Sequence, residues 1–420
     1  MTTDRRYRVL AVCAHPVQYM SPILRRMAQH PQLELKVAYC SLRGAEAAHD
    51  SEFGTTVQWD VPLLDGYDWL EVPNHGSGSE SFFGLNNPGL WKLIREGHFD
   101  AILCYTGYVR ASFWIALVAA RLSGAAMIFG TDASSLAPRD ARSWKVTLKK
   151  ITWPWLFRLA DQVIVPSTAG AELMRSLGIP EDRITLTPFV VDNDWWSTQS
   201  SRVDRLAVRT SWGVAPHQSV VLFCAKLQPW KRPLDLLRAF ARAEVTDSVL
   251  VIAGEGPLRQ QLESEIEQLG ITARVRLLGF VNQTQLPALY TASDLLVFPS
   301  SFEPFGVVVN EAYLCGCPVA ASDRVGAARD LIAPVDPKLI FPSADVSALT
   351  RILRCVLQDR ARLAELGRAA RRHMETWTPQ ENISATVKAI ALAIQRRRGN
   401  EPPSARIPGS AISSSGSSKT

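Results

Sequence analysis

Short apolar runs alternate with amphipathic segments along most of the chain. The runs have the length of β-strands, and the segments between them repeat apolar residues at helical spacing. Such alternation predicts parallel sheets that are covered by helices on both faces. The predicted strands are 8–14, 33–40, 101–104, 126–129, 162–165, 184–187, 219–224, 248–253, 274–279, 294–298, 318–321 and 339–341. The predicted helices are 21–29, 111–122, 169–177, 233–243, 258–269, 285–291, 307–314, 346–358, 360–376 and 379–396.

Two stretches depart from this alternation. Residues 57–88 are rich in Gly, Asn, Asp, Ser and aromatic residues, which predicts a long loop that shapes a binding site. Residues 142–158 (RSWKVTLKKITWPWLFR) interleave Lys and Arg with Trp, a pattern that suits a membrane surface. The alternative is a helix that packs on its domain and exposes its Lys side chains to water. Pro154 breaks the amphipathic pattern.

A third stretch, residues 298–319 (FPSSFEPFGVVVNEAYLCGCPV), joins a strand end to a helix start. The turn at Gly306 precedes the predicted helix, whose first N–H groups and dipole suit a phosphate. Glu303 and Glu311 bracket this turn, and Glu311 lies roughly 7–8 Å along the helix axis at 1.5 Å per residue. An acid on each side of a diphosphate matches a nucleotide-sugar, which carries its sugar at one end and its ribose at the other. An ordinary strand-turn-helix with surface acids is the alternative.

These residues resemble the signature of the retaining glycosyltransferases of family 4, in which seven residues separate two Glu. The resemblance covers residues 8–395 and is sharpest from 219 to 345. It implies the GT-B architecture, an α/β fold of two doubly wound Rossmann-like parallel-sheet domains that face each other across a cleft. The implied segments are an N-terminal acceptor-side domain (1–187), a linker (188–205), a C-terminal nucleotide-sugar-binding domain (206–378), a helix that crosses back to the N-terminal domain (379–396) and a disordered tail (397–420).

The resemblance also assigns roles around the turn at Gly306. Glu303 would anchor hydroxyls of the transferred sugar, and Glu311 would hold the ribose. Phe305, Gly306 and Val307 would offer backbone N–H groups to the sugar and the phosphates.

Two lysines complete the predicted donor site. Lys226 and Lys231 match positions at which the family carries basic residues that reach the donor diphosphate. The first of these is often Arg in the family, so Lys226 keeps the charge and loses the bidentate fork. Transfer without a metal needs such cations, because the leaving diphosphate gains negative charge as the glycosidic bond breaks. Two solvated loop lysines are the alternative.

Three further positions lie near the expected nucleotide. Gly254 in the VIAGEGPL segment would permit a close backbone approach. Glu255 is either a ligand or a solvated acid of the turn. Phe280 lies in a segment that resembles the one whose backbone reads the edge of the base in the family.

In the first half, two residues follow predicted strands and should face the cleft. His15 ends the opening strand in AHPVQYMSP, where many relatives carry glycines, and it has either a role in the cleft or a packed position beside a turn. Asp132 resembles the acidic or His position that relatives place near the reacting sugar. It could instead cap the following segment, as Asp often does.

The amino-acid composition narrows the class of protein. The chain of 420 residues is 47% hydrophobic and 20% charged, which is typical of a globular protein of two domains. The net charge of +6 comes largely from the last 25 residues, which hold five Lys or Arg and one Glu, so it gives no argument for nucleic acid. Seven scattered cysteines without metal-ligand spacing indicate a reducing compartment. We expect no signal peptide, no membrane span and no metal site.

The sequence therefore predicts a cytoplasmic retaining glycosyltransferase with possible peripheral contact at the inner face of the membrane. The expected donor is a UDP- or GDP-sugar, used without metal or cofactor, and the expected acceptor is a hydroxyl of a glycan or a lipid-linked molecule. The expected mechanism is front-face departure, in which the leaving phosphate helps to deprotonate the incoming hydroxyl. The alternative is a non-catalytic regulatory subunit that keeps the fold and the nucleotide site.

Overall fold

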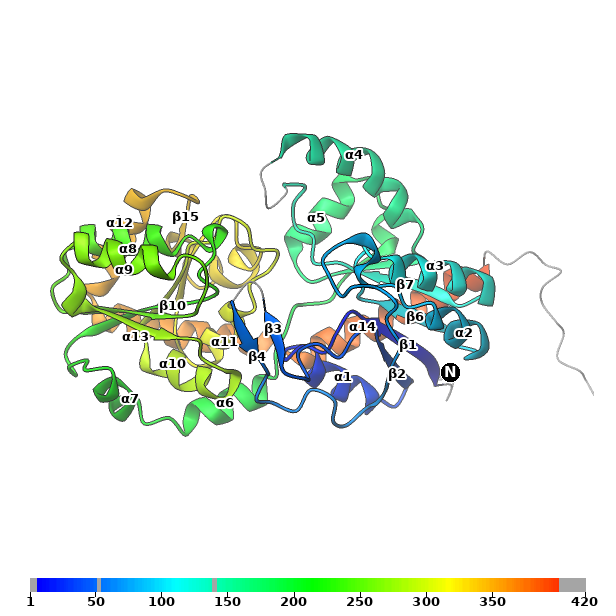
Figure 1. Ribbon diagram of the computed structural model, residues 1–420, viewed down its shortest axis with the longest axis horizontal. Helices are drawn as coiled ribbons and strands as arrows, with labels where there is room; N and C mark the ends of the chain where they lie inside the picture. The colour runs from blue at the N-terminus through cyan, green and yellow to red at the C-terminus, as the bar shows by residue number, and fades with distance from the viewer. Residues whose placement is uncertain (1–5, 51–53, 138–141, 400–420) are drawn as a thin grey trace, which may run out of the picture.

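Two all-parallel sheets form the two halves of the protein (Figure 1). The structure is a computed structural model, and it describes residues 6–50, 54–137 and 142–399. The first sheet has the strand order β5-β2-β1-β6-β7-β8-β9, and the second has the order β12-β11-β10-β13-β14-β15. The predicted fold of two doubly wound Rossmann-like domains is confirmed.

The strands of the first sheet are Tyr7–Cys13 (β1), Leu33–Tyr39 (β2), Asp68–Glu71 (β5), Ala101–Cys104 (β6), Ala126–Gly130 (β7), Gln162–Val165 (β8) and Ile184–Leu186 (β9). Those of the second sheet are Ser219–Cys224 (β10), Ser248–Ala253 (β11), Val275–Gly279 (β12), Leu295–Phe298 (β13), Val319–Ser322 (β14) and Ile340–Phe341 (β15). A separate antiparallel hairpin consists of Ala48–Asp50 (β3) and Thr55–Val57 (β4).

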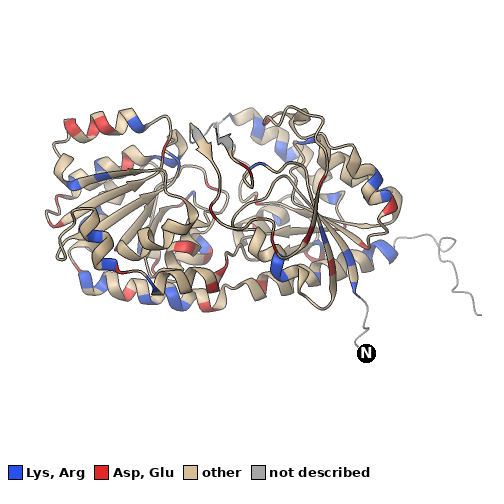
Figure 2. Cartoon of the chain, turned by 60° about the horizontal axis from the view of Figure 1, so that its bottom comes forward, with Lys and Arg blue, Asp and Glu red and all other residues tan. Residues whose placement is uncertain are grey.

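The helices before the second sheet are Ser21–Ala28 (α1), Gly89–Glu96 (α2), Ala111–Ser123 (α3), Ser143–Arg158 (α4), Thr168–Ser176 (α5), Asn193–Ser201 (α6) and Arg205–Ser211 (α7). The later helices are Pro233–Ala243 (α8), Arg259–Gln268 (α9), Leu286–Ala292 (α10), Val308–Leu314 (α11), Val346–Leu357 (α12), Arg360–His373 (α13) and Pro379–Gly399 (α14). Acidic and basic residues are interspersed over the helices of both domains (Figure 2).

The first sheet is buried on both faces, which explains its continuous apolar strands. In β1, Leu10 and Val12 pack into one core, and Val9, Ala11 and Cys13 pack into another. Because successive strand residues point to opposite faces, a strand between two helix layers needs apolar residues at every position. The second domain has one large core around β10, β11 and β13.

The structure corrects two predictions from sequence and settles the course of the chain at Pro154. The expected loop 57–88 contains β5, which pairs in parallel with β2 at the edge of the first sheet. Helix α4 continues through Pro154, and its residues Trp153, Leu156 and Phe157 are buried on either side of the proline. Residues 397–399, expected in the disordered tail, belong to the end of α14, and the rest of that tail lies outside the described residues.

Helix α14 starts in the second domain and runs along the first (Figure 1). Its start is a capping box: the backbone N–H of Thr378 donates to the Glu381 carboxylate at 3.1 Å, and the N–H of Glu381 donates to the Thr378 hydroxyl at 3.4 Å. At its other end, Arg396 donates to the backbone oxygen of Asp161 at 2.6 Å. The capping box thus fixes the start of the helix, and packing along its length and the Arg396 hydrogen bond hold it on the N-terminal domain.

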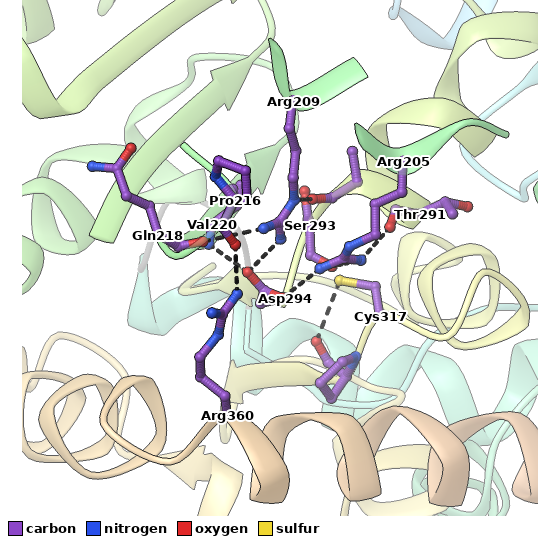
Figure 3. A network of polar contacts seen from close by, with 12 residues as sticks. Arg205, Arg209, Pro216, Gln218, Val220, Thr291, Ser293, Asp294, Cys317 and Arg360 are labelled. Atoms are coloured by element: carbon purple, nitrogen blue, oxygen red, sulfur yellow. Dashed lines mark hydrogen bonds and ion pairs between the residues drawn. The ribbon is translucent and has the colours of Figure 1, made fainter. Parts of the chain in front are cut away.

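A buried ionic network fixes the start of β13, the strand that leads to Glu303 (Figure 3). The Asp294 carboxylate accepts from Arg205 and from Arg209, each at 2.5 Å, and from the backbone N–H of Val220 at 2.6 Å. Arg209 also donates to the backbone oxygen of Ala292 at 2.8 Å. Because the Arg209 side chain is only 4% exposed, loss of the carboxylate charge leaves a buried cation without its partner.

We predict that Asp294→Asn lowers the free energy of unfolding by about 3 kcal/mol, because it leaves the Arg209 cation buried and unpaired. Urea denaturation followed by circular dichroism measures this. Asp247→Asn is the matched control, because the Asp247 side chain is 72% exposed and pairs with His217 at the surface. Equal stability of the two variants would contradict the role given to Asp294.

Candidate functional site

A cavity of about 1160 Å³ lies between the two domains. Its walls come mainly from the N-terminal domain, including His15, Tyr19, Asp132 and Trp153, while residues 301–304 of the C-terminal domain close it from the other side. All strands in both sheets are parallel, so the loops after them gather at one edge of each sheet. The cavity is the space where these two edges meet.

Each predicted residue on the N-terminal side follows a strand. His15 follows β1 and Asp132 follows β7, and both line the cavity together with Glu303. Burial is the main cause that raises the pKa of Asp132, and the negative charge of Glu303 adds to it. The structure therefore brings His15, Asp132 and Glu303 to one cavity, as the site prediction requires, although their chemical roles stay predictions.

Glu303 is held by an ion pair with Lys231. Lys231 ends a short 3₁₀-helix, Pro229–Lys231, and its ammonium also lies 5.0 Å from the centre of the Phe298 ring. The two loops are joined by the Ser301 backbone N–H, which donates to the Trp230 oxygen at 2.7 Å. The side chains of Lys231 and Glu303 are 17% and 15% exposed, so little water screens the pair.

The turn after Glu303 requires glycine. Gly306 has φ +100°, and a Cβ there would lie 2.8 Å from a Phe298 ring carbon and 3.2 Å from Glu303 Cγ. The backbone oxygen of Glu303 accepts from Gly326 N–H at 3.0 Å, and that of Phe305 accepts from Ala327 N–H at 2.8 Å. Backbone contacts to the loop after β14 thus hold the turn in place.

Glu311 lies apart from the cavity. It is 3% exposed, and the Tyr290 hydroxyl donates to its carboxylate at 2.9 Å. Burial raises the pKa of Glu311 to about 8. Its predicted contact with a ribose stays a prediction.

The other predicted donor residues lie at the carboxyl ends of β10, β11 and β12. Half-buried Lys226 follows β10. The backbone N–H of the next residue, Leu227, donates to the backbone oxygen of Glu255 at 2.8 Å. A Cβ on Gly254 would lie 2.0 Å from the Ala225 oxygen, so these loops approach each other only because Gly254 has none. The Glu255 carboxylate pairs with Arg259 at 3.0 Å.

Phe280 and its neighbours contact the start of the long loop 57–88 of the N-terminal domain, a contact that the sequence did not predict. The Trp59 ring lies 6.4 Å from the Phe280 ring, and Asn282 donates to the Gln58 oxygen at 2.8 Å. Thr284 donates its N–H to the Asp60 carboxylate at 3.1 Å. Residue types in a long loop give no signal for such contacts between domains, because pairing depends on where the loop folds.

Tyr19 is a second residue that sequence reasoning did not assign to the site. It lines the cavity, and burial raises its pKa to about 12, with further contributions from the negative charges of Asp132 and Glu303. Its place four residues after His15, in the loop that follows β1, was the available signal.

The described residues contain no group of three or more His, Cys, Asp or Glu side chains placed to hold a metal ion. They also contain no helix whose length and hydropathy fit a membrane crossing.

Comparisons with known proteins agree with this architecture. Residues 204–373 match the family described as Glycosyl transferases group 1, and residues 32–189 match the Glycosyl transferase 4-like domain. The chain is 31% identical over 293 residues to 2-deoxystreptamine glucosyltransferase of Streptomyces kanamyceticus. This alignment covers 67% of this chain and 73% of that enzyme. It is 34% identical over 260 residues to D-inositol 3-phosphate glycosyltransferase of Mycobacterium bovis, and this alignment covers 58% of this chain and 52% of that enzyme. Several relatives are thus matched over only about half of their length.

Solved structures show the same fold. The structure of Anabaena HepE in complex with UDP and glucose superposes with a TM-score of 0.69 at 19% identity, over 92% of this chain and all of that one. WaaG, described as a glycosyltransferase involved in lipopolysaccharide biosynthesis, gives a TM-score of 0.57 at 16% identity, over 92% of this chain and 99% of that one.

The fold and the cavity between two facing Rossmann-like domains define a protein of the GT-B class. Within that class, the chain belongs to the glycosyl transferases group 1 family. The predicted membership of this family is confirmed.

We predict that Glu311→Gln weakens the pH dependence of stability. The folded protein favours the neutral acid, so Glu311 stabilises the fold at low pH and this contribution is lost as the pH rises from about 5 to about 8. The loss is on the order of 4 kcal/mol at about 1.4 kcal/mol per pKa unit, and the variant should lack it. Urea denaturation at both pH values measures the difference, with the partly exposed Glu263→Gln as control. The same pH dependence in wild type and Glu311→Gln would contradict the burial argument.

Proposed function

We propose that the protein transfers a sugar from a nucleoside-diphosphate sugar, a UDP- or GDP-sugar, to a hydroxyl of a glycan or lipid-linked acceptor with retention of configuration. The observation that carries the proposal is the position of Glu303, which pairs with Lys231 at the edge of the C-terminal sheet and lines one cavity together with Asp132 of the N-terminal domain. The Anabaena structure with UDP and glucose supports a nucleotide-sugar donor by analogy of fold.

On the donor side, the chemistry needs positive charge where the diphosphate leaves. Lys231 and Lys226 follow β10 and supply two ammonium groups on the nucleotide side of the cleft. In a site with little water, such cations stabilise the charge that develops on the leaving group, and no metal is required. Glu303 binds hydroxyls of the sugar and so fixes the anomeric carbon relative to the acceptor.

On the acceptor side, the mechanism is front-face departure. The acceptor hydroxyl approaches on the face from which the diphosphate leaves, and a phosphate oxygen takes its proton. The new bond forms on that same face, so the configuration is retained. His15 and Asp132 line the acceptor side of the cavity and orient the incoming molecule. In this proposal the enzyme works in the cytoplasm, with peripheral contact at the inner face of the membrane.

The proposal is tested with a panel of UDP- and GDP-sugars labelled in the sugar, in buffer that contains EDTA. We expect hydrolysis or transfer of at least one donor, with product of the same anomeric configuration by proton NMR. Tight binding of a donor without any turnover would contradict the proposal and favour the non-catalytic nucleotide-sugar-binding subunit. Inverted product would contradict the retaining mechanism.

We predict that Lys231→Ala lowers kcat by about 10²-fold, the size typical of losing one group that stabilises a developing negative charge, with a smaller effect on donor KM. The assay measures donor turnover under saturating donor. Lys338→Ala is the matched control, because Lys338 is an exposed lysine of the same domain. An unchanged kcat in Lys231→Ala would contradict the role proposed for Lys231.

A further inference from the structure

Helix α4 exposes a continuous apolar stripe. Trp144, Leu148, Ile151 and Trp155 are 57%, 49%, 63% and 71% exposed. They are spaced by four, three and four residues, so at about 100° per residue they fall within an arc of about 60° on the helix. Exposed large apolar residues are normal when scattered, whereas four in one row on one helix indicate a surface that contacts something apolar.

The opposite face of α4 belongs to the cavity. Val146, Lys149 and Trp153 line it, and Trp153 is 4% exposed, with its indole N–H donating to the Tyr108 hydroxyl at 2.8 Å. This inner face anchors the helix to its domain, so the outer row is not needed for packing among the described residues. One helix therefore carries a wall of the cavity on one face and an exposed apolar row on the other. In Figure 1, α4 lies at the outer margin of the N-terminal domain.

The charges around the stripe favour an anionic lipid surface over other apolar partners. Residues 142–160 contain five Lys or Arg and no Asp or Glu. Lys145 and Lys150 fall on either side of the apolar row by helical spacing, and the Lys145 ammonium lies 5.7 Å from the centre of the Trp144 ring. Trp side chains at the boundary of headgroups and acyl chains, with cations beside them, are the pattern of a helix that lies in the membrane interface.

We infer that the outer face of α4 docks on an anionic bilayer and that the acceptor is a lipid-linked molecule held in that bilayer. With α4 in the interface, the cavity on its inner face lies beside the headgroups, where the hydroxyl of a lipid-linked acceptor is available. The choice of acceptor rests on the proposed sugar transfer, whereas the docking does not.

Flotation with vesicles of phosphatidylcholine, with and without phosphatidylglycerol, tests the docking. We expect the full-length protein to float with the anionic vesicles, less so at high salt, and the double variant Ile151→Ser/Trp155→Ser to bind at least about tenfold more weakly. Leu206→Ser is the control, because Leu206 is also exposed, at 55%, but lies on α7 of the other domain. Wild type that stays unbound, or a double variant that binds as wild type does, would overturn the inference.

Sedimentation without vesicles tests a second copy of the chain as the occupant of the stripe. We expect the same mass for wild type and the double variant, and a wild-type dimer that the double variant loses would overturn the inference.

The acceptor class is tested with the donor from the panel that turns over and a lipid extract of the source organism reconstituted in anionic vesicles. We expect wild type to move label into the organic phase and the double variant to do so at least about tenfold more slowly, with equal donor hydrolysis in the absence of vesicles. Label that enters only the water phase would overturn the lipid-linked acceptor. Failure of vesicle binding with intact donor turnover would refute this inference alone, and vesicle binding without donor turnover would refute the proposed function alone.

Discussion

Parallel strands place all of their carboxyl ends at one edge of a sheet, and this constraint organises the whole molecule. Lys226, Glu255, Phe280 and Glu303 come from four different segments of the sequence, yet each follows a strand of the same sheet. His15 and Asp132 follow strands of the other sheet in the same way. Because the two edges face each other, Glu303 lines one cavity with His15 and Asp132, although hundreds of positions separate them in the sequence.

Burial then determines how these residues behave. Lys231 and Glu303 neutralise each other at the edge of the sheet, where little water reaches the two side chains. Asp132 lines the same cavity as Glu303, and burial raises its pKa, with a further contribution from the negative charge of Glu303. The carboxyl of Asp132 therefore keeps its proton to higher pH than a solvated acid does.

The regular elements could be predicted where one physical rule dominated. The bounds of β6, β8, β10, β11 and α8 were predicted from continuous apolar runs and helical spacing, and the structure confirms them. Edge strand β5 was missed because its residues are at most partly buried and carry no apolar pattern. Pro154 breaks the amphipathic pattern of residues 142–158, yet α4 continues across it, with Trp153, Leu156 and Phe157 buried beside the proline.

The candidate site residues were predicted from the ends of strands, whereas their contacts could not be predicted. Glu303, Asp132 and His15 each follow a strand and line the cavity, and their roles stay predictions. The burial of Glu311 beside Tyr290 depends on how α10 and α11 pack, and the contact of Trp59 with Phe280 depends on the path of a long loop. Neither contact can be predicted from residue types at a fixed spacing.

A crystal structure with a bound nucleoside-diphosphate sugar tests the central claim most directly. The account predicts the diphosphate within hydrogen-bond distance of Lys231 and of the backbone N–H groups of residues 305–307, with the sugar beside Glu303. A diphosphate bound elsewhere, with the Lys231–Glu303 pair unchanged and remote from it, would contradict the account.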